Sequence, residues 1–316
     1  MIDIEKSKRD VGFVAVALAF IFMLSLIVQL IALPLLLWLS PSLADSAVFA
    51  WVMGSVPLYL IAMPCSLVFF WRVPAARPTK QLATKRTFVA MLAVCLVSTY
   101  LLSYVGSFVN ELFSSLLGIP AANELEATTT AAPLWANLIF LVLLAPVFEE
   151  IFLRKLVIDR LLPYGEIAAI LLSGIAFGLV HGNFNQLFYA VASGILFGFL
   201  YVKTGSLKLN IALHACLNFF GGVYGAEIQK LESQVTQIGP LSSVTLASIL
   251  NAVYVAILVA AALVCLVLLF RFKRWRHLLR FAPPPTPISA ADWRSILLAN
   301  PFVYFFLAFS VLLFFI

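Results

Sequence analysis

The chain has 316 residues, of which 63% are hydrophobic and 11% are charged. Soluble domains average about 45–50% apolar and about 25% charged residues, so this composition excludes a soluble globular protein and indicates an integral membrane protein. The formal net charge of +6 comes from residues in short loops between apolar runs. This placement indicates membrane topology and excludes nucleic acid as the expected partner.

Nine apolar runs follow one another along the chain, and most approach the roughly 20 residues needed to cross a bilayer. The sequence therefore predicts an all-α fold, a polytopic membrane helical bundle with about nine transmembrane helices in one membrane domain. The runs are residues 11–39, 47–71, 88–109, 132–153, 167–180, 184–202, 209–224, 244–270 and 296–316.

Charge placement predicts the orientation of this bundle. If the N-terminus is inside, 19 of the 20 Lys and Arg residues fall in inner segments, and Lys230 alone falls outside. Cationic residues collect on the cytoplasmic side of membrane proteins. We therefore expect a multi-pass protein of the cell membrane with a cytoplasmic N-terminus and an outer C-terminus.

Two runs are short for a crossing, because 167–180 has 14 residues and 209–224 has 16. Each borders or contains a histidine, which favours a polar cavity lined by protein. At 1.5 Å per residue, His181 is expected about 22 Å from the inner face and His214 about 9 Å. Tilt of the fifth helix or local thinning of the bilayer is needed to bring them together.

Two GxxxG pairs mark the fifth and sixth runs. Gly174 and Gly178 lie in the fifth, and Gly194 and Gly198 lie in the sixth. Small residues at this spacing let membrane helices approach closely. The pattern predicts tight packing between these two helices.

Ionisable side chains within a span are costly and indicate function. Glu149 and Glu150 end the fourth run, His181 follows the fifth, and His214 stands with Asn218 in the seventh. Each group also has a structural explanation: an interfacial acid cluster, a helix cap, or an interhelical hydrogen bond.

Spacing separates the two glutamates. Adjacent residues sit about 100° apart on a helix, so Glu149 and Glu150 are expected to have different roles. Glu150 precedes Arg154 by four residues, a spacing that allows an ion pair on one helix face. Glu149 is then freer to face a cavity, and the opposite division stays open.

Carboxylates, imidazoles and an amide on three helices suit the activation of water. A glutamate can accept the proton of water, and His and Asn side chains can stabilise the resulting oxyanion. Alternatively, Glu149, His181 and His214 make a three-ligand set for zinc, whose bound water ionises near neutral pH. The sequence does not choose between these mechanisms.

Three motifs in order resemble those of the Abi or CAAX-protease and bacteriocin-processing family, which includes type II CAAX prenyl proteases. EExxxR is met by "EEIFLR" (149–154), FxxxH by "FGLVH" (177–181) and HxxxN by "HACLN" (214–218). Each motif alone is weak, but the ordered set is specific. The resemblance covers about 132–224 and divides the chain into N-terminal helices (1–131), a catalytic core (132–224) and C-terminal helices (225–316).

The resemblance implies an α-helical intramembrane endopeptidase that acts on membrane-associated, prenylated or precursor peptides in the lipid bilayer. It implies that Glu149 activates water, supported by Glu150, His181, His214 and Asn218, with Arg154 holding the carboxylates and Phe177 packing the site. Both zinc-dependent and metal-free mechanisms stay open. The alternatives are a proton-coupled transporter and a non-catalytic, peptide-sequestering immunity protein of the same fold.

Overall fold

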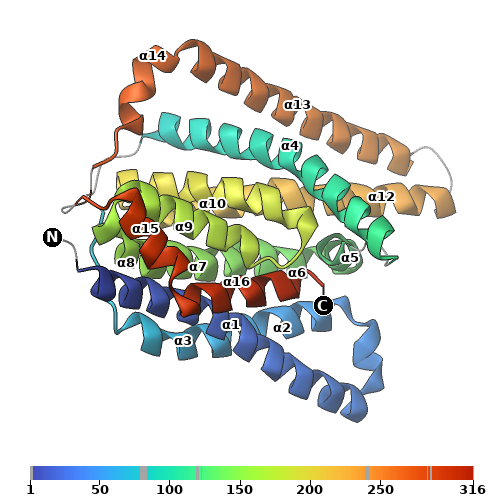
Figure 1. Ribbon diagram of the computed structural model, residues 1–316. Helices are drawn as coiled ribbons and strands as arrows, with labels where there is room; N and C mark the ends of the chain where they lie inside the picture. Colours follow the sequence, from blue (N-terminus) through green and yellow to red (C-terminus); the bar gives the residue numbers. More distant parts are fainter. Residues whose placement is uncertain are drawn as a thin grey trace.

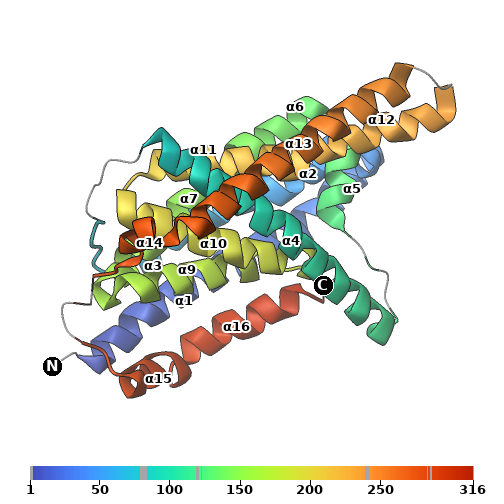
Figure 2. The same cartoon turned by 90° about the horizontal axis from the view of Figure 1, so that it is seen from above.

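The computed structural model describes residues 3–78, 84–118, 121, 123–238, 242–282, 284 and 287–315. Within these residues every regular element is a helix, so the predicted all-α fold is confirmed. Most of the long helices lie alongside one another in an elongated bundle (Figures 1 and 2).

The N-terminal part pairs two long spans and adds a third. The first span is α1, and the second joins α2, a π-helical segment η2 and α3; the third is α4, and the short α5 follows it. Their bounds are α1 Ile4–Leu39, η1 Pro41–Asp45, α2 Ala47–Ser55, η2 Val56–Ala62, α3 Met63–Phe70, α4 Lys85–Leu117 and α5 Glu124–Ala131.

The central part holds the predicted core. Its first span, Leu134–Tyr164, alternates between α-helical and π-helical segments. The bounds are α6 Leu134–Asn137, η3 Leu138–Leu144, α7 Ala145–Glu150, η4 Ile151–Ile158, α8 Asp159–Leu161, η5 Leu162–Tyr164, α9 Glu166–Leu179, α10 Phe184–Thr204, α11 Leu207–Asn218, η6 Phe219–Val223 and α12 Tyr224–Ile238.

The C-terminal part consists of a long helix and a bent pair. The bounds are α13 Ser242–Phe270, α14 Phe272–Trp275, η7 Arg276–Leu279, α15 Ala290–Leu298 and α16 Pro301–Leu313. Helices α15 and α16 meet at an angle of 63°. Pro301 begins α16, where the missing backbone N–H is tolerated.

Among the described residues, seven helices are long and apolar enough to cross a membrane, and up to eight if α15 and α16 form one span. The predicted count of nine is therefore confirmed only in part. The shortfall is α9, because its 14 residues extend about 21 Å, less than the roughly 30 Å of hydrocarbon.

The helix ends gather at two opposite ends of the bundle, as expected if successive spans alternate in direction. The N-terminal end of α1 and helices α8 and α14 lie at one end of the bundle, and α5 and the C-terminal part of α12 lie at the other (Figure 1). The face of this bundle that meets the cytoplasm stays a prediction.

Helices α9 and α10 pack as closely as their glycines predict. A Cβ added at Gly174 would lie 2.5 Å from Cγ1 of Ile195, and one at Gly194 would lie 2.9 Å from Cα of Gly174. Neither distance is compatible with a side chain. Glycine at these two positions therefore lets the two backbones meet.

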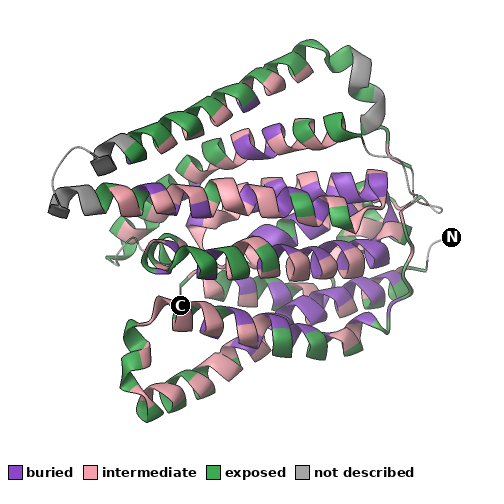
Figure 3. Cartoon of the chain, turned by 180° about the vertical axis from the view of Figure 1, so that it is seen from behind, coloured by how far each residue is buried: buried purple, intermediate pink, exposed green. Residues whose placement is uncertain are grey.

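Burial is concentrated inside the bundle (Figure 3), where α10 packs against α9 and α4 and where α1 packs against η2, α3 and α16. Helix α13 is mostly exposed on the outside of the bundle. Exposed apolar side chains on a candidate span are expected to face lipid. The buried core combines the helices that carry the three motifs with α1, the second span and α4.

Candidate active site

The helix that carries the two glutamates is interrupted on both sides. Glu149 and Glu150 stand on α7, between the π-helical segments η3 and η4. Pro146 lacks a backbone N–H, and the N–H of Ala145 bonds to the carbonyl of Phe140, five residues back. Such π-helical turns are frequent at functional sites, and the sequence did not predict them.

Glu150 and Arg154 form the predicted ion pair, and both side chains are completely buried. Nε of Arg154 donates to Oε2 of Glu150 at 3.0 Å, and Nη1 donates to Oγ of Ser173 at 2.8 Å. The guanidinium also lies 5.1 Å and 5.7 Å from the ring centroids of Phe177 and Phe197. A buried pair needs such additional partners to compensate its desolvation.

The carboxylate of Glu150 also holds His214. Nδ1 of His214 lies 3.0 Å from Oε1 of Glu150, and Nδ2 of Asn210 donates to Oε2 at 3.1 Å. A carboxylate partner places the imidazole proton on Nδ1 and leaves Nε2 as an acceptor. That nitrogen lies 3.8 Å from Oε2 of Glu149.

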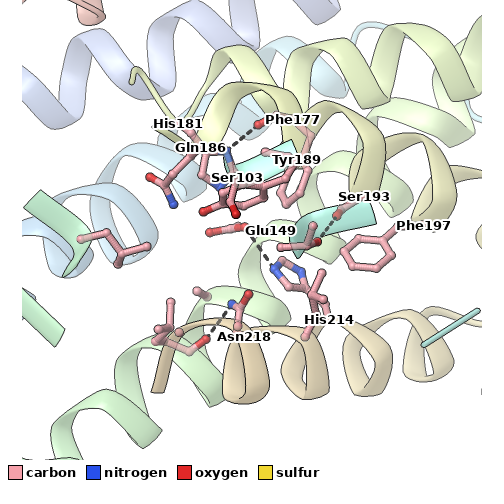
Figure 4. Close-up of a pocket in the computed structure, with 18 of the residues that line it drawn as sticks. Ser103, Glu149, Phe177, His181, Gln186, Tyr189, Ser193, Phe197, His214 and Asn218 are labelled. Carbon is pink, nitrogen blue, oxygen red and sulfur yellow. Dashed lines mark hydrogen bonds and ion pairs between the residues drawn. The ribbon is translucent and has the colours of Figure 1, made fainter. Parts of the chain in front are cut away.

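Glu149 faces a cavity. It lies between His181 and His214 (Figure 4), in the wall of a cavity of ≈ 270 Å³. Its Oε1 accepts a hydrogen bond of 2.8 Å from the hydroxyl of Tyr59. The tyrosine ring stacks on Phe148, with ring centroids 5.1 Å apart. Glu149 thus has an accessible carboxylate with a fixed orientation.

His181 reaches the same cavity from the turn after α9. Its Nδ1 lies 2.6 Å from the carbonyl oxygen of Phe177, so the proton is on Nδ1. The Phe177 ring meets both imidazoles edge-on, at centroid distances of 4.9 Å from His181 and 5.5 Å from His214. The two histidines therefore line one cavity despite their different expected depths.

Asn218 lies at the end of α11 and also lines the cavity. Its Nδ2 donates to the carbonyl oxygen of Leu141 at 2.9 Å. This bond uses one of the two amide hydrogens and orients the side chain.

The predicted site residues thus fall into two groups. The cavity is lined by Glu149, Phe177, His181, His214 and Asn218. The wall behind it contains Glu150 and Arg154, which are absent from the cavity lining.

The sequence missed three polar residues of this region: Tyr59, Ser173 and Asn210. Tyr59 carries a hydroxyl group within the second apolar run, and Ser173 and Asn210 are small polar residues within the two short runs. A search for neutral polar groups inside the spans would have found all three, because such groups need partners in a membrane.

The zinc set of Glu149, His181 and His214 stays a prediction. Within the described ranges, no three His, Cys, Asp or Glu side chains form a group that could hold a metal ion. Glu149, His181 and His214 all belong to those ranges.

Comparisons with known proteins concern the region that contains these residues. Residues 131–220 match the family described as type II CAAX prenyl endopeptidase Rce1-like. The chain is also 32% identical over 99 residues to "Putative membrane peptidase YdiL" of Bacillus subtilis (strain 168), covering 30% of this chain and 41% of that protein. It thus spans about two fifths of that relative's length. No solved structure matches the chain. The resemblance inferred from the three motifs is confirmed.

Proposed function

We propose that this chain, whose residues 131–220 belong to the Rce1-like type II CAAX prenyl endopeptidase family, is an intramembrane endopeptidase of the cell membrane. Its substrates are membrane-associated peptides or proteins, with prenylated proteins as the family precedent and peptide precursors as the other class. The N-terminus faces the cytoplasm, as the distribution of Lys and Arg favours.

One observation carries the proposal: the two adjacent glutamates have different surroundings. Glu150 is completely buried and bound to Arg154, whereas Glu149 lines the cavity. A general base must reach the water that it deprotonates, so the accessible carboxylate is the candidate. Glu149 therefore acts as the base, and Glu150 positions His214.

The reaction is a hydrolysis in which Glu149 accepts and returns one proton. Water bound between Glu149 and His214 gives a proton to the carboxylate, and its oxygen attacks the carbonyl carbon of the scissile peptide. Glu149 then donates that proton to the amide nitrogen as the C–N bond breaks. A carboxylic acid and an amine are released, and the carboxylate is regenerated.

The hydrogen-bond partners assign further roles. With Nδ1 as the donor, each neutral imidazole presents Nε2 as an acceptor, which suits His214 and His181 to orienting water. The free amide hydrogen of Asn218 is a donor for the oxyanion that forms on the attacked carbonyl. Phe177 keeps the two imidazoles apart and in place.

Cleavage of peptides by the purified protein tests this function. Wild-type protein in lipid nanodiscs would be incubated with a pool of membrane-segment peptides, with and without a farnesyl group, and products identified by mass spectrometry. Glu149→Gln should reduce kcat by about 10²–10⁴-fold, the usual contribution of a general base. Glu111→Gln, on an exposed part of α4, is the matched control and should be as active as wild type.

The alternatives give other outcomes. Proton-coupled solute flux in proteoliposomes without any cleavage would support a transporter, and tight peptide binding that Glu149→Gln leaves unchanged would support sequestration. Cleavage abolished by a chelator and restored by zinc would require the metal mechanism and overturn the assignment of a metal-free glutamate.

A further inference from the structure

A second, smaller chamber also reaches Glu149. Its volume is ≈ 160 Å³, and it shares Glu149 and His181 with the main cavity. The remaining wall is entirely apolar and comes from α1, η2, α3, η4 and the end of α9. These residues are Leu18, Ile21, Phe22, Leu58, Met63, Phe152, Leu153 and Val180.

We infer that this chamber is the specificity pocket of the enzyme, where an apolar side chain flanking the scissile bond is bound. The inference rests on the proposed peptidase function. Glu149 and His181 are the two polar groups among the residues that line it, so an occupant meets the reacting groups at one end and hydrocarbon elsewhere. A peptide with its carbonyl at Glu149 fits this description.

Size identifies the occupant as a side chain rather than a lipid chain. An apolar protein cavity of about 150 Å³ binds one benzene molecule, so a chamber of ≈ 160 Å³ accommodates one phenylalanine or leucine side chain. A fifteen-carbon isoprenoid is far larger. We therefore expect Trp and isoprenoid groups to be too large for the chamber, and Ala to leave it partly empty.

The apolar wall is closely packed, which favours selection by size. Ile21, Met63, Phe152 and Leu153 are all at most 5% exposed, and buried apolar walls of this kind respond to a change of one methylene. In an apolar pocket, a missing or extra methylene changes kcat/KM by about 10–200-fold.

The position of the chamber separates chemistry from specificity. Leu18, Leu58 and Met63 belong to the first two spans, outside residues 131–220 that match the family. Substrate choice is therefore made largely by the N-terminal helices of this chain. Family membership fixes the reacting groups and leaves the choice of substrate to those helices.

Two substitutions of opposite size test the pocket. After the cleaved bond is identified by mass spectrometry, each flanking position would be varied among Ala, Leu, Phe and Trp in an otherwise identical peptide, and kcat/KM measured in nanodiscs. Wild type should prefer Leu or Phe over Ala and Trp by about 10-fold or more at one position. Met63→Ala enlarges the chamber and should raise kcat/KM for the Trp peptide at least about 10-fold relative to that for the Leu peptide. Leu18→Phe narrows the chamber and should lower kcat/KM for the Phe peptide to that of the Ala peptide.

The controls keep the result interpretable. Met53 is also buried, at 9% exposure, and lines neither chamber, so Met53→Ala should keep the wild-type order of peptides. If thermal unfolding shows that one chamber variant is not folded, the other variant still tests the pocket. Ile21→Val provides a milder enlargement of the chamber.

The outcomes separate the two proposals. If Met63→Ala and Leu18→Phe cleave the peptides with the same order of kcat/KM as wild type, the pocket is overturned and the peptidase function stands. A change restricted to farnesylated peptides would also overturn it, because the occupant would then be the lipid chain. If wild type cleaves no peptide, both proposals fail.

Discussion

The span Leu134–Tyr164 and helix α13 are both long and apolar enough to cross a membrane. The α13 segment is the more apolar of the two, yet only 6% of its most apolar window is buried, compared with 44% in Leu134–Tyr164. The less apolar span carries Glu149, Glu150 and Arg154. Charge thus marks the core in this comparison, whereas hydropathy alone does not decide burial, because α1 is nearly as apolar as α13 and 50% of its most apolar window is buried.

The physical reason is the solvent. Lipid is as apolar as a leucine side chain, so burying apolar surface between helices gains packing contacts but no hydrophobic driving force. A charge, in contrast, is stable only where protein groups surround it. Around Glu150 these groups are Arg154, Asn210 and His214. Substitutions test this difference between the two spans, with the largest effect expected at Arg154 and the smallest on α13.

Removing the guanidinium should have the largest effect on stability. Arg154→Met leaves Glu150 as a buried charge without its ion-pair partner, so we expect a loss of about 3–5 kcal/mol in the free energy of unfolding. Denaturant titration of the purified protein in detergent measures this loss. The double variant Glu150→Gln with Arg154→Met should lose less than the sum of the two single variants, and an additive loss would contradict the pairing.

His214 should matter chiefly for catalysis. His214→Gln removes the imidazole that faces Glu149, so we expect kcat to fall by about 10²–10³-fold. The variant should still fold and show a cooperative unfolding transition. Groups that act as a unit are not additive. Combining His214→Gln with Glu149→Gln should therefore give little further loss, and multiplicative losses would show that the two side chains act separately.

Tyr59 should have an intermediate effect as a positioning residue. Tyr59→Phe keeps the ring that stacks on Phe148 and removes the hydrogen bond to Glu149. A hydrogen bond to a charged group contributes about 1.5–3 kcal/mol, so kcat should fall by about 10–100-fold with little change in KM. Tyr100 also lines the cavity, so Tyr100→Phe is the control. An equal fall of kcat in both variants would show that Tyr59 does not position Glu149.

The smallest effect is expected on the lipid-facing helix. Leu263 on α13 is 57% exposed, so Leu263→Ala should change the free energy of unfolding by less than about 0.5 kcal/mol. Leu161 is 2% exposed, and Leu161→Ala should cost about 2–5 kcal/mol. Equal losses in the two variants would mean that α13 is packed against another protein surface.

Much of this arrangement was predictable because it is local in the sequence. Glu150 and Arg154 are four residues apart on one helix, so their pairing follows from helix geometry. The approach of α9 to α10 follows from Gly174 and Gly194. Nine apolar runs were expected, and α9 falls short of a crossing for the reason that its length already indicated.

The rest could not be predicted because it joins distant segments. Tyr59 is 90 residues from Glu149, and Asn210 is 60 residues from Glu150. Their contacts depend on which helices are neighbours and on the π-helical turns in η2, η3 and η4. Spacing along one helix carries no information about a partner on another helix.

The sequence by itself predicted the all-α fold with candidate membrane spans, the resemblance to the Rce1-like family over residues 131–220, and the set of candidate site side chains. These follow from composition and from motifs at helical spacing. Tertiary structure alone decided between the two glutamates as the one that faces the cavity, brought Tyr59 and Asn210 to the site, and formed the second chamber from apolar residues of α1, η2, α3 and η4. The physical reason is that close packing between spans, and not the order of residues within one span, fixes where a cavity forms and what lines it.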